Sequence, residues 1–129
     1  MNYRAVLIED NEQNRYLATF LLEGRGYTVA HASDGATGVE IARTVVPDVI
    51  LLDIQLPQMD GYAVARELRR VATLDGVPIV AVTSFAMAGD REAAMAAGCD
   101  GYIEKPIDPD TFVDQVTAHL RNRAPHGTP

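Results

Sequence analysis

The sequence predicts an α/β fold, a doubly wound five-stranded parallel sheet with five helices. Five short runs rich in β-branched and aliphatic residues recur along the 129-residue chain, and each precedes a longer segment with helical spacing. Strands that alternate with helices in this way form right-handed βαβ crossovers, which place the strands parallel in one sheet. A chain of this length suits one compact domain.

The five expected strands are short runs bounded by Gly, Pro or Asp, which favours strand over buried helix. They are Arg4–Ile8, Thr28–Ala32, Val49–Asp53, Ile79–Thr83 and Gly101–Glu104. The third and fourth begin with four apolar residues in succession, a pattern typical of parallel strands covered on both faces.

The first expected helix carries apolar residues at i, i+1, i+4 and i+5, namely Tyr16, Leu17, Phe20 and Leu21. This spacing is typical of a helix. Gly24 then offers a C-terminal stop. A second, shorter helix opens after Ser33 and Asp34, which are both favourable N-caps.

Three more helices follow the later strands. One is entered through Asp60-Gly61 and is lined by Tyr62, Ala65, Leu68 and Ala72. The next is the alanine-rich segment Ala88–Ala97. The last has Asp108 as N-cap and Pro109 in its first turn, and its apolar face comprises Phe112, Val113, Val116 and Leu120. We expect one domain over residues 1–123, a flexible tail over 124–129 and no output domain.

Composition and charge exclude several classes of function. The net charge is −7 and there is no basic stripe, so nucleic acid and anionic membrane are poor candidate partners. No run of about 18 apolar residues could span a bilayer. The single cysteine, Cys99, cannot form an internal disulfide and lacks the spacing of a zinc site. These features predict a small buried cysteine and a cytoplasmic protein.

Polar side chains gather where the strands end, which is where doubly wound sheets bind their ligands. Glu9 and Asp10 follow the first strand, Asp53 ends the third, Thr83 ends the fourth and Lys105 follows the fifth. Three neighbouring carboxylates repel one another, so at least one pKa is expected to be raised unless a cation joins them. Mg²⁺ prefers such oxygen ligands.

These residue types suit phosphoryl transfer. Three carboxylates, one Mg²⁺ and Lys105 together are neutral, which leaves a site that tolerates an incoming phosphoryl group. Thr83 adds a hydroxyl donor for a phosphoryl oxygen. Asp53 ends a strongly apolar strand and is the natural nucleophile.

The ordered set of polar residues resembles that of the receiver domain of two-component response regulators. The residues that carry the resemblance are Glu9-Asp10, Asp53 followed by Asp60-Gly61, Thr83-Ser84, Tyr102 and Lys105-Pro106. The likeness spans all but the short tail. It implies strand order 2-1-3-4-5 and a phosphoryl group accepted on Asp53 from a phosphohistidine, carried by a histidine kinase or a histidine phosphotransfer protein.

The resemblance also implies individual roles. Asp10 and Asp53 would bind Mg²⁺ directly, together with the backbone carbonyl of Gln55, and Glu9 would act through water. Lys105 would pair with Asp53 or its phosphoryl group, and the Lys105-Pro106 bond would be cis.

The switch is implied in the same way. Thr83 would follow the phosphoryl group inward, and Tyr102 would rotate from exposed to buried. Gln55 and Phe85 would flank the path of the attacking water. A protein target would then bind the face built from Ala88–Ala97, Gly101–Glu104 and the last helix. The donor would touch residues 11–15, and the protein would be a monomer or a phosphorylation-dependent dimer.

Three other functions compete with a phosphorylated signalling protein. A phosphatase of the haloacid dehalogenase type also uses a strand-end Asp with Mg²⁺, but it needs a second Asp at the position of Gln55. An interaction module independent of phosphorylation would typically lose the acids or the lysine, and all are present. A nucleotide-binding flavodoxin-like protein would need a glycine-rich loop after the first strand, where Asp10-Asn-Glu-Gln stands instead.

Overall fold

The sheet has five parallel strands in the order β2-β1-β3-β4-β5, as expected. The computed structural model describes residues 2–84 and 89–120. All five strands have the predicted bounds: β1 Arg4–Ile8, β2 Thr28–Ala32, β3 Val49–Asp53, β4 Ile79–Thr83 and β5 Gly101–Glu104. The doubly wound fold class is therefore confirmed.

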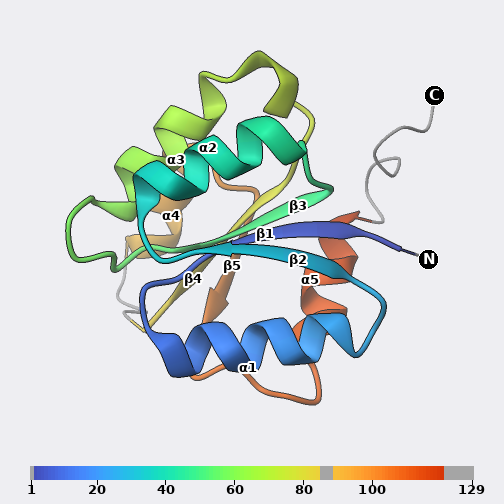
Figure 1. Ribbon diagram of the computed structural model, residues 1–129. Helices are drawn as coiled ribbons and strands as arrows, with labels where there is room; N and C mark the ends of the chain where they lie inside the picture. Colours follow the sequence, from blue (N-terminus) through green and yellow to red (C-terminus); the bar gives the residue numbers. More distant parts are fainter. Residues whose placement is uncertain (1, 85–88, 121–129) are drawn as a thin grey trace.

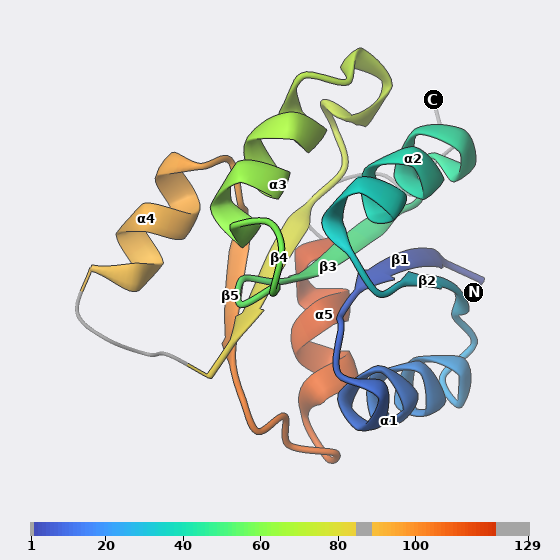
Figure 2. The ribbon, with the colours of Figure 1, turned by 60° about the vertical axis from the view of Figure 1, so that its left-hand side comes forward.

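Helices cover both faces of this sheet. They are α1 Glu12–Glu23, α2 Gly35–Val45, α3 Gly61–Arg69, the 3₁₀ helix η1 Ala72–Leu74, α4 Asp90–Ala96 and α5 Phe112–Leu120. α1 and α5 lie on one face, whereas α2, α3 and α4 lie on the other (Figures 1 and 2). Because all the strand pairs are parallel, the carboxyl ends of the five strands lie at one edge of the sheet.

The core has two layers because β3 is buried on both sides. Its alternate side chains Ile50 and Leu52 pack toward α2, α3 and α4. Val49 and Leu51 pack toward α1 and α5. Every residue of β3 is buried, and so is every residue of β4. The two apolar runs are therefore central strands of the sheet, buried on both faces.

Side-chain caps define where the chain turns from strand to helix. Asn11 Oδ1 accepts a hydrogen bond from the Asn14 N–H at 2.9 Å and begins α1. Asp34 and Asp60 cap α2 and α3 in the same way. These caps leave short polar connections at the carboxyl edge of the sheet.

The apolar residues that indicate α1 in the sequence are not the ones that the helix buries. Tyr16 is 73% exposed and Phe20 is 62% exposed, and their rings stack on each other with centroids 6.3 Å apart. The residues that α1 buries are Ala18 and Leu22. The helix is rotated so that the buried stripe lies two residues further along the sequence than Tyr16 and Phe20.

Three helix boundaries differ from prediction. α4 spans Asp90–Ala96, inside the expected segment Ala88–Ala97. Ala72 lies outside α3, in η1, and is exposed, because α3 ends at Arg69. α5 begins at Phe112 rather than at Pro109. Asp108 instead closes the preceding turn: its side chain accepts from the Asp110 N–H at 2.9 Å, and its carbonyl accepts from the N–H of Phe112.

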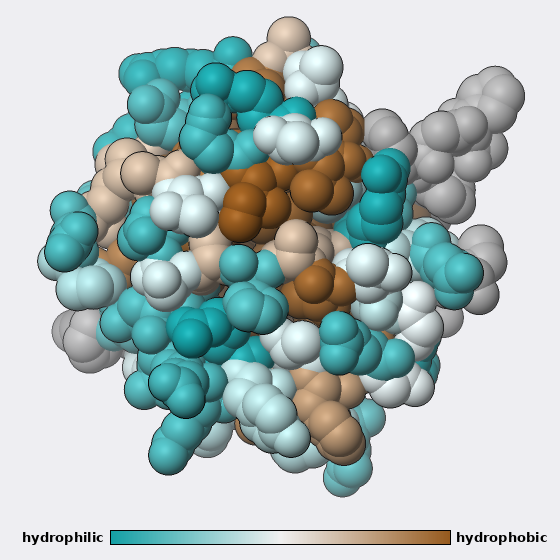
Figure 3. Space-filling model, viewed as in Figure 1, coloured by the Kyte–Doolittle hydropathy of each residue, from teal (hydrophilic) through white to brown (hydrophobic). Residues whose placement is uncertain are grey.

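Parts of the expected last helices and tail lie outside the described residues. These are Ala88 and residues 124–129, and Phe85, expected beside the path of the attacking water, lies outside them too. Within the described ranges, no helix reaches the length and hydrophobicity that a membrane span requires. The face shown in Figure 3 is largely hydrophilic, with a group of hydrophobic side chains in the region of α2.

Candidate functional site

The strand register brings the predicted site residues to one edge of the sheet. Ile8 pairs with Leu52, so Glu9 and Asp53 follow paired positions on β1 and β3. Asp53 in turn pairs with Val82, the residue before Thr83. Thr83 pairs with Glu104, the residue before Lys105. Residues almost a hundred positions apart in the sequence therefore meet at the carboxyl ends of four neighbouring strands.

Three carboxylates converge at this edge. Glu9, Asp10 and Asp53 each offer an oxygen, and these oxygens lie within 4.8 Å of one another. Glu9 and Asp53 are buried, with 4% and 3% of their surface exposed, and Asp10 is exposed. The cluster thus has two acids in its floor and one at its mouth.

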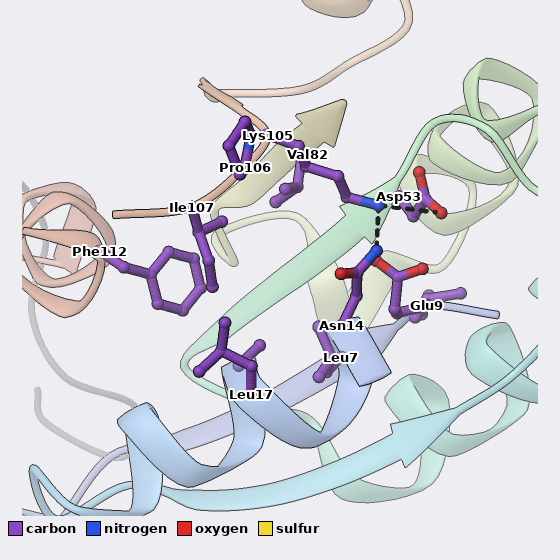
Figure 4. Close-up of a pocket in the computed structure, with 12 residues that line it drawn as sticks. Leu7, Glu9, Asn14, Leu17, Asp53, Val82, Lys105, Pro106, Ile107 and Phe112 are labelled. Atoms are coloured by element: carbon purple, nitrogen blue, oxygen red, sulfur yellow. Dashed lines mark ion pairs between the residues drawn. The ribbon is translucent and has the colours of Figure 1, made fainter. Parts of the chain in front are cut away.

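Lys105 neutralises part of this charge. Its Nζ lies 2.7 Å from Glu9 Oε1 and 3.4 Å from Asp53 Oδ2 (Figure 4). The expected pairing with Asp53 is present, and the pair with Glu9 is the shorter of the two. The Lys105 N–H also donates to the Thr83 carbonyl at 2.8 Å, and the Lys105-Pro106 bond is cis, as expected.

The pKa of Asp53 is raised. Burial of the carboxylate is the main cause, and the negative charge of Glu9 adds to it. A hydrogen bond from the Gln55 N–H and the positive charge of Lys105 act in the opposite direction. The expectation of a raised pKa is confirmed, although burial contributes more to it than the repulsion between acids that suggested it.

Backbone and guanidinium donors that the sequence did not reveal hold the acidic residues in place. The Gln55 N–H donates to Asp53 Oδ1 at 2.9 Å, and the Asn11 N–H donates to Glu9 Oε2 at 3.0 Å. Arg15 donates through Nη1 to the Glu9 carbonyl at 2.9 Å. Each buried carboxylate therefore accepts one bond from the loop that leaves its own strand.

The two residues expected to form a switch lie on β4 and β5. Thr83 is buried at the end of β4, and Tyr102 is half-buried on β5. The pKa of Tyr102 is raised, chiefly by loss of solvent and then by the charges of Asp90 and Glu104. The pKa of Tyr62 on α3 is raised as well, chiefly by burial and then by the charge of Asp90.

A cavity of about 80 Å³ adjoins the acidic cluster between α1 and the segment that leads from β5 to α5. Leu17, Ile107 and Phe112 form part of its apolar wall (Figure 4). Glu9, Asp53 and Lys105 close its polar end. The aliphatic stem of Lys105 therefore lies against apolar surface, while its ammonium faces the acids.

The cluster fits a divalent metal ion. Hard cations such as Mg²⁺ take carboxylate and carbonyl oxygens and retain several waters. The exposed carboxylate of Asp10, next to two buried acids, provides a ligand open to solvent on that side. Two carboxylates in the floor remain only partly compensated by one lysine, so a cation at the mouth would relieve their repulsion.

Comparison with known families agrees with this geometry. The model of the response regulator receiver domain matches residues 5–117. The chain belongs to this family. A receiver domain is a signalling module of two-component systems rather than a conventional enzyme, and receiver domains bind Mg²⁺ in their acidic pocket.

Curated relatives and solved structures are similar over nearly the whole receiver domain. The polar-differentiation response regulator DivK of Brucella ovis is 38% identical over 120 residues, which span 93% of this chain and 98% of the relative. DivK of Brucella anthropi is 39% identical over 115 residues, 89% of this chain and 94% of the relative.

Among solved structures, the receiver domain of the sensor histidine kinase PA1611 from Pseudomonas aeruginosa has a magnesium ion coordinated in its active-site cleft. It is 33% identical, with a TM-score of 0.85 over 94% of this chain and 99% of that one. A CheY-like receiver domain protein from Methanospirillum hungatei shares the fold, with a TM-score of 0.87 at 24% identity over 95% of this chain and 96% of that one.

Proposed function

We propose that this receiver domain accepts a phosphoryl group on Asp53 from a phosphohistidine of a histidine kinase or a histidine phosphotransfer protein. The observation that supports this best is the environment of Asp53: a buried carboxylate within 3.4 Å of the Lys105 ammonium, among acids whose oxygens lie within 4.8 Å. A nucleophile, a metal site and a fixed cation are the parts that phosphoryl transfer needs.

In the transfer, a carboxylate oxygen of Asp53 forms a bond to phosphorus as the phosphorus–nitrogen bond to the donor imidazole breaks. The imidazole nitrogen keeps the electron pair of that bond. Asp10, Asp53 and the Gln55 carbonyl are proposed to hold Mg²⁺, with Glu9 acting through water. When bound, Mg²⁺ supplies positive charge for the phosphoryl oxygens.

Lys105 and Thr83 are proposed to sense the new group. Phosphorylation places three strong acceptors where a single carboxylate stood. Lys105 already lies near both buried acids and can form a charge-assisted bond to a phosphoryl oxygen with little displacement. Thr83 supplies a hydroxyl from the end of β4, and Tyr102 on the neighbouring strand β5 would rotate inward in response.

The signal is proposed to leave through the surface formed by α4, β5 and α5. These elements follow Thr83 in the chain, and β5 carries Tyr102 and leads directly to Lys105, so changes at the site reach them first. The phosphohistidine donor is expected at the other side of the site, near residues 11–15. We propose a cytoplasmic protein that is a monomer or dimerises on phosphorylation.

A hydrolytic phosphatase is the less favoured function. Such an enzyme needs an acid–base group two residues after the nucleophile, where this chain has Gln55, an amide that cannot transfer a proton. The site therefore favours formation of an aspartyl phosphate over multiple turnovers.

Phosphoryl labelling tests the proposal. With acetyl phosphate and Mg²⁺, the wild-type chain should form a phosphoprotein that is stable to acid and labile to hydroxylamine, as an acyl phosphate is. Asp53→Asn should abolish the label, because the amide is not a nucleophile. Asp75→Asn, at an exposed aspartate away from the cluster, is the matched control and should label like wild type.

Absence of label from the wild type, with acetyl phosphate and with phosphohistidine donors, would leave the interaction module as the better account. Label that survives in Asp53→Asn would place the acceptor elsewhere.

A further inference from the structure

Gln55 connects the phosphoryl acceptor to the first residue beyond β4. Its backbone N–H donates to Asp53 Oδ1 at 2.9 Å. Its side-chain Oε1 accepts a hydrogen bond from the Ser84 N–H at 3.1 Å. One residue thus joins the Asp53 carboxylate to the backbone donor that directly follows Thr83.

This link extends the sheet beyond the point where backbone pairing ends. The last backbone bond between the two strands at this edge runs from the Ile54 N–H to the Val82 carbonyl at 3.2 Å. Ser84 lies two residues further along, and its N–H is bound by a side chain instead of by a strand. The Gln55 side chain can therefore release the Ser84 N–H without breaking any backbone hydrogen bond of the sheet.

A phosphoryl group on Asp53 would compete for the same donor. Asp53 pairs with Val82 on β4, two residues before Ser84, so oxygens added to its carboxylate would lie near this donor. A hydrogen bond from a backbone N–H to a charged oxygen is roughly twice as strong as one to a neutral amide. The exchange of Gln55 Oε1 for a phosphoryl oxygen is therefore favourable, but it costs the bond that Gln55 makes.

We infer that Gln55 is a positioning residue whose carboxamide competes internally with the phosphoryl group for the Ser84 N–H. In the unphosphorylated chain it fixes this donor in its resting position and weakens binding of the phosphoryl group. This inference rests on the proposed role of Asp53 as the acceptor, and it assigns the Gln55 side chain a role separate from that of its backbone carbonyl.

The test uses beryllium fluoride with Mg²⁺ as a phosphoryl mimic. Gln55→Met is nearly isosteric but has no amide acceptor, so its dissociation constant for the mimic should be about two- to fivefold lower than that of the wild type, as expected for removal of one exposed neutral hydrogen bond. Gln55→Asn, shorter by one methylene, should shift it in the same direction. Gln58→Met, at an exposed glutamine of the same loop, is the matched control and should leave it unchanged.

The Ser84 amide provides a readout that a general structural role would not move. Its hydrogen exchange should become faster in both Gln55 variants before any mimic is added, and remain as in the wild type in Gln58→Met. If Gln55→Met and Gln55→Asn bind the mimic with the same affinity as the wild type, the inference is overturned, and the role of Asp53 is untouched. The same holds if Gln58→Met also binds the mimic more tightly than the wild type. Failure of the wild type to bind the mimic would instead count against Asp53 as the acceptor.

Discussion

Asp53 must be ionised to act as a nucleophile, but its ionised form is unfavourable in a buried position. A nucleophilic carboxylate must be ionised, yet burial and the charge of Glu9 raise the pKa of Asp53. Ionised Asp53 therefore destabilises the folded state relative to an unfolded chain in which the carboxylate is solvated. Lys105 and the Gln55 N–H offset part of this cost, since both favour the charged form.

The sign of this effect predicts a stabilising substitution. The unfolded aspartate ionises near its ordinary pKa of 3.8, whereas the native one retains its proton to higher pH. The folded state thus binds more protons above pH 3.8, and the free energy of unfolding falls as pH rises toward the native pKa. Asp53→Asn removes this dependence and should raise the melting temperature at pH 7.5 by a few degrees.

Thermal unfolding without divalent cations checks this prediction. The difference between Asp53→Asn and wild type should be large at pH 7.5 and shrink as the pH falls to 3.8. Asp75→Asn should show no comparable gain. A variant less stable than wild type at pH 7.5 would mean that the lost pairing with Lys105 outweighs the relief of burial.

At the scale of the element, α1 shows that the spacing of apolar residues predicts a helix but not which of its faces packs on the sheet. Its apolar residues do recur with helical spacing, but Tyr16 and Phe20 lie on the solvent side while Leu22 is fully buried. Asn11 caps the helix and Arg15 holds the Glu9 carbonyl. The orientation of α1 thus supports the acidic cluster as well as the core.

This orientation predicts that two alanine substitutions in α1 reduce the free energy of unfolding by very different amounts. Leu22→Ala leaves a cavity between α1 and the sheet and should reduce the free energy of unfolding by about 2–5 kcal/mol. Phe20→Ala removes a larger side chain from the surface and should change it by roughly 0.5 kcal/mol or less. Urea denaturation of both variants measures the difference, and equal losses would contradict the observed rotation of α1.

At the scale of the whole molecule, the sheet assembles a site that no single segment contains. Glu9 and Asp10 come from the end of β1, Asp53 from β3, Thr83 from β4 and Lys105 from the end of β5. Because these ends meet only in the folded chain, a ligand that joins the three acids binds the native state and stabilises it.

Magnesium should therefore raise the melting temperature of the entire domain. At a free Mg²⁺ concentration one hundred times the dissociation constant, mass action predicts about 2.7 kcal/mol of added stability. Calorimetry in MgCl₂ and in NaCl of matched ionic strength separates this effect from screening. Asp10→Asn, which removes the exposed ligand, should lose most of the gain, and identical curves in the two salts would argue against a metal site.

The sequence by itself determined the strands and the membership of the acidic cluster. Each strand is a short run that either ends in a polar residue or is followed directly by one, so its bounds are encoded within a few residues. Asp53 and Thr83 end such runs and Glu9 follows one, and parallel register then leaves little choice about where they meet.

Tertiary structure decided how the elements face one another. The spacing of apolar residues fixes their angle around a helix axis but not the rotation of that helix against a sheet, so the exposure of Tyr16 and Phe20 followed from docking. The polar partners of long side chains also depend on the folded structure. Lys105 pairs with Glu9, and Gln55 accepts a hydrogen bond from the Ser84 N–H. Local patterning thus specifies which residues reach the edge of the sheet, and packing specifies which of them bind each other.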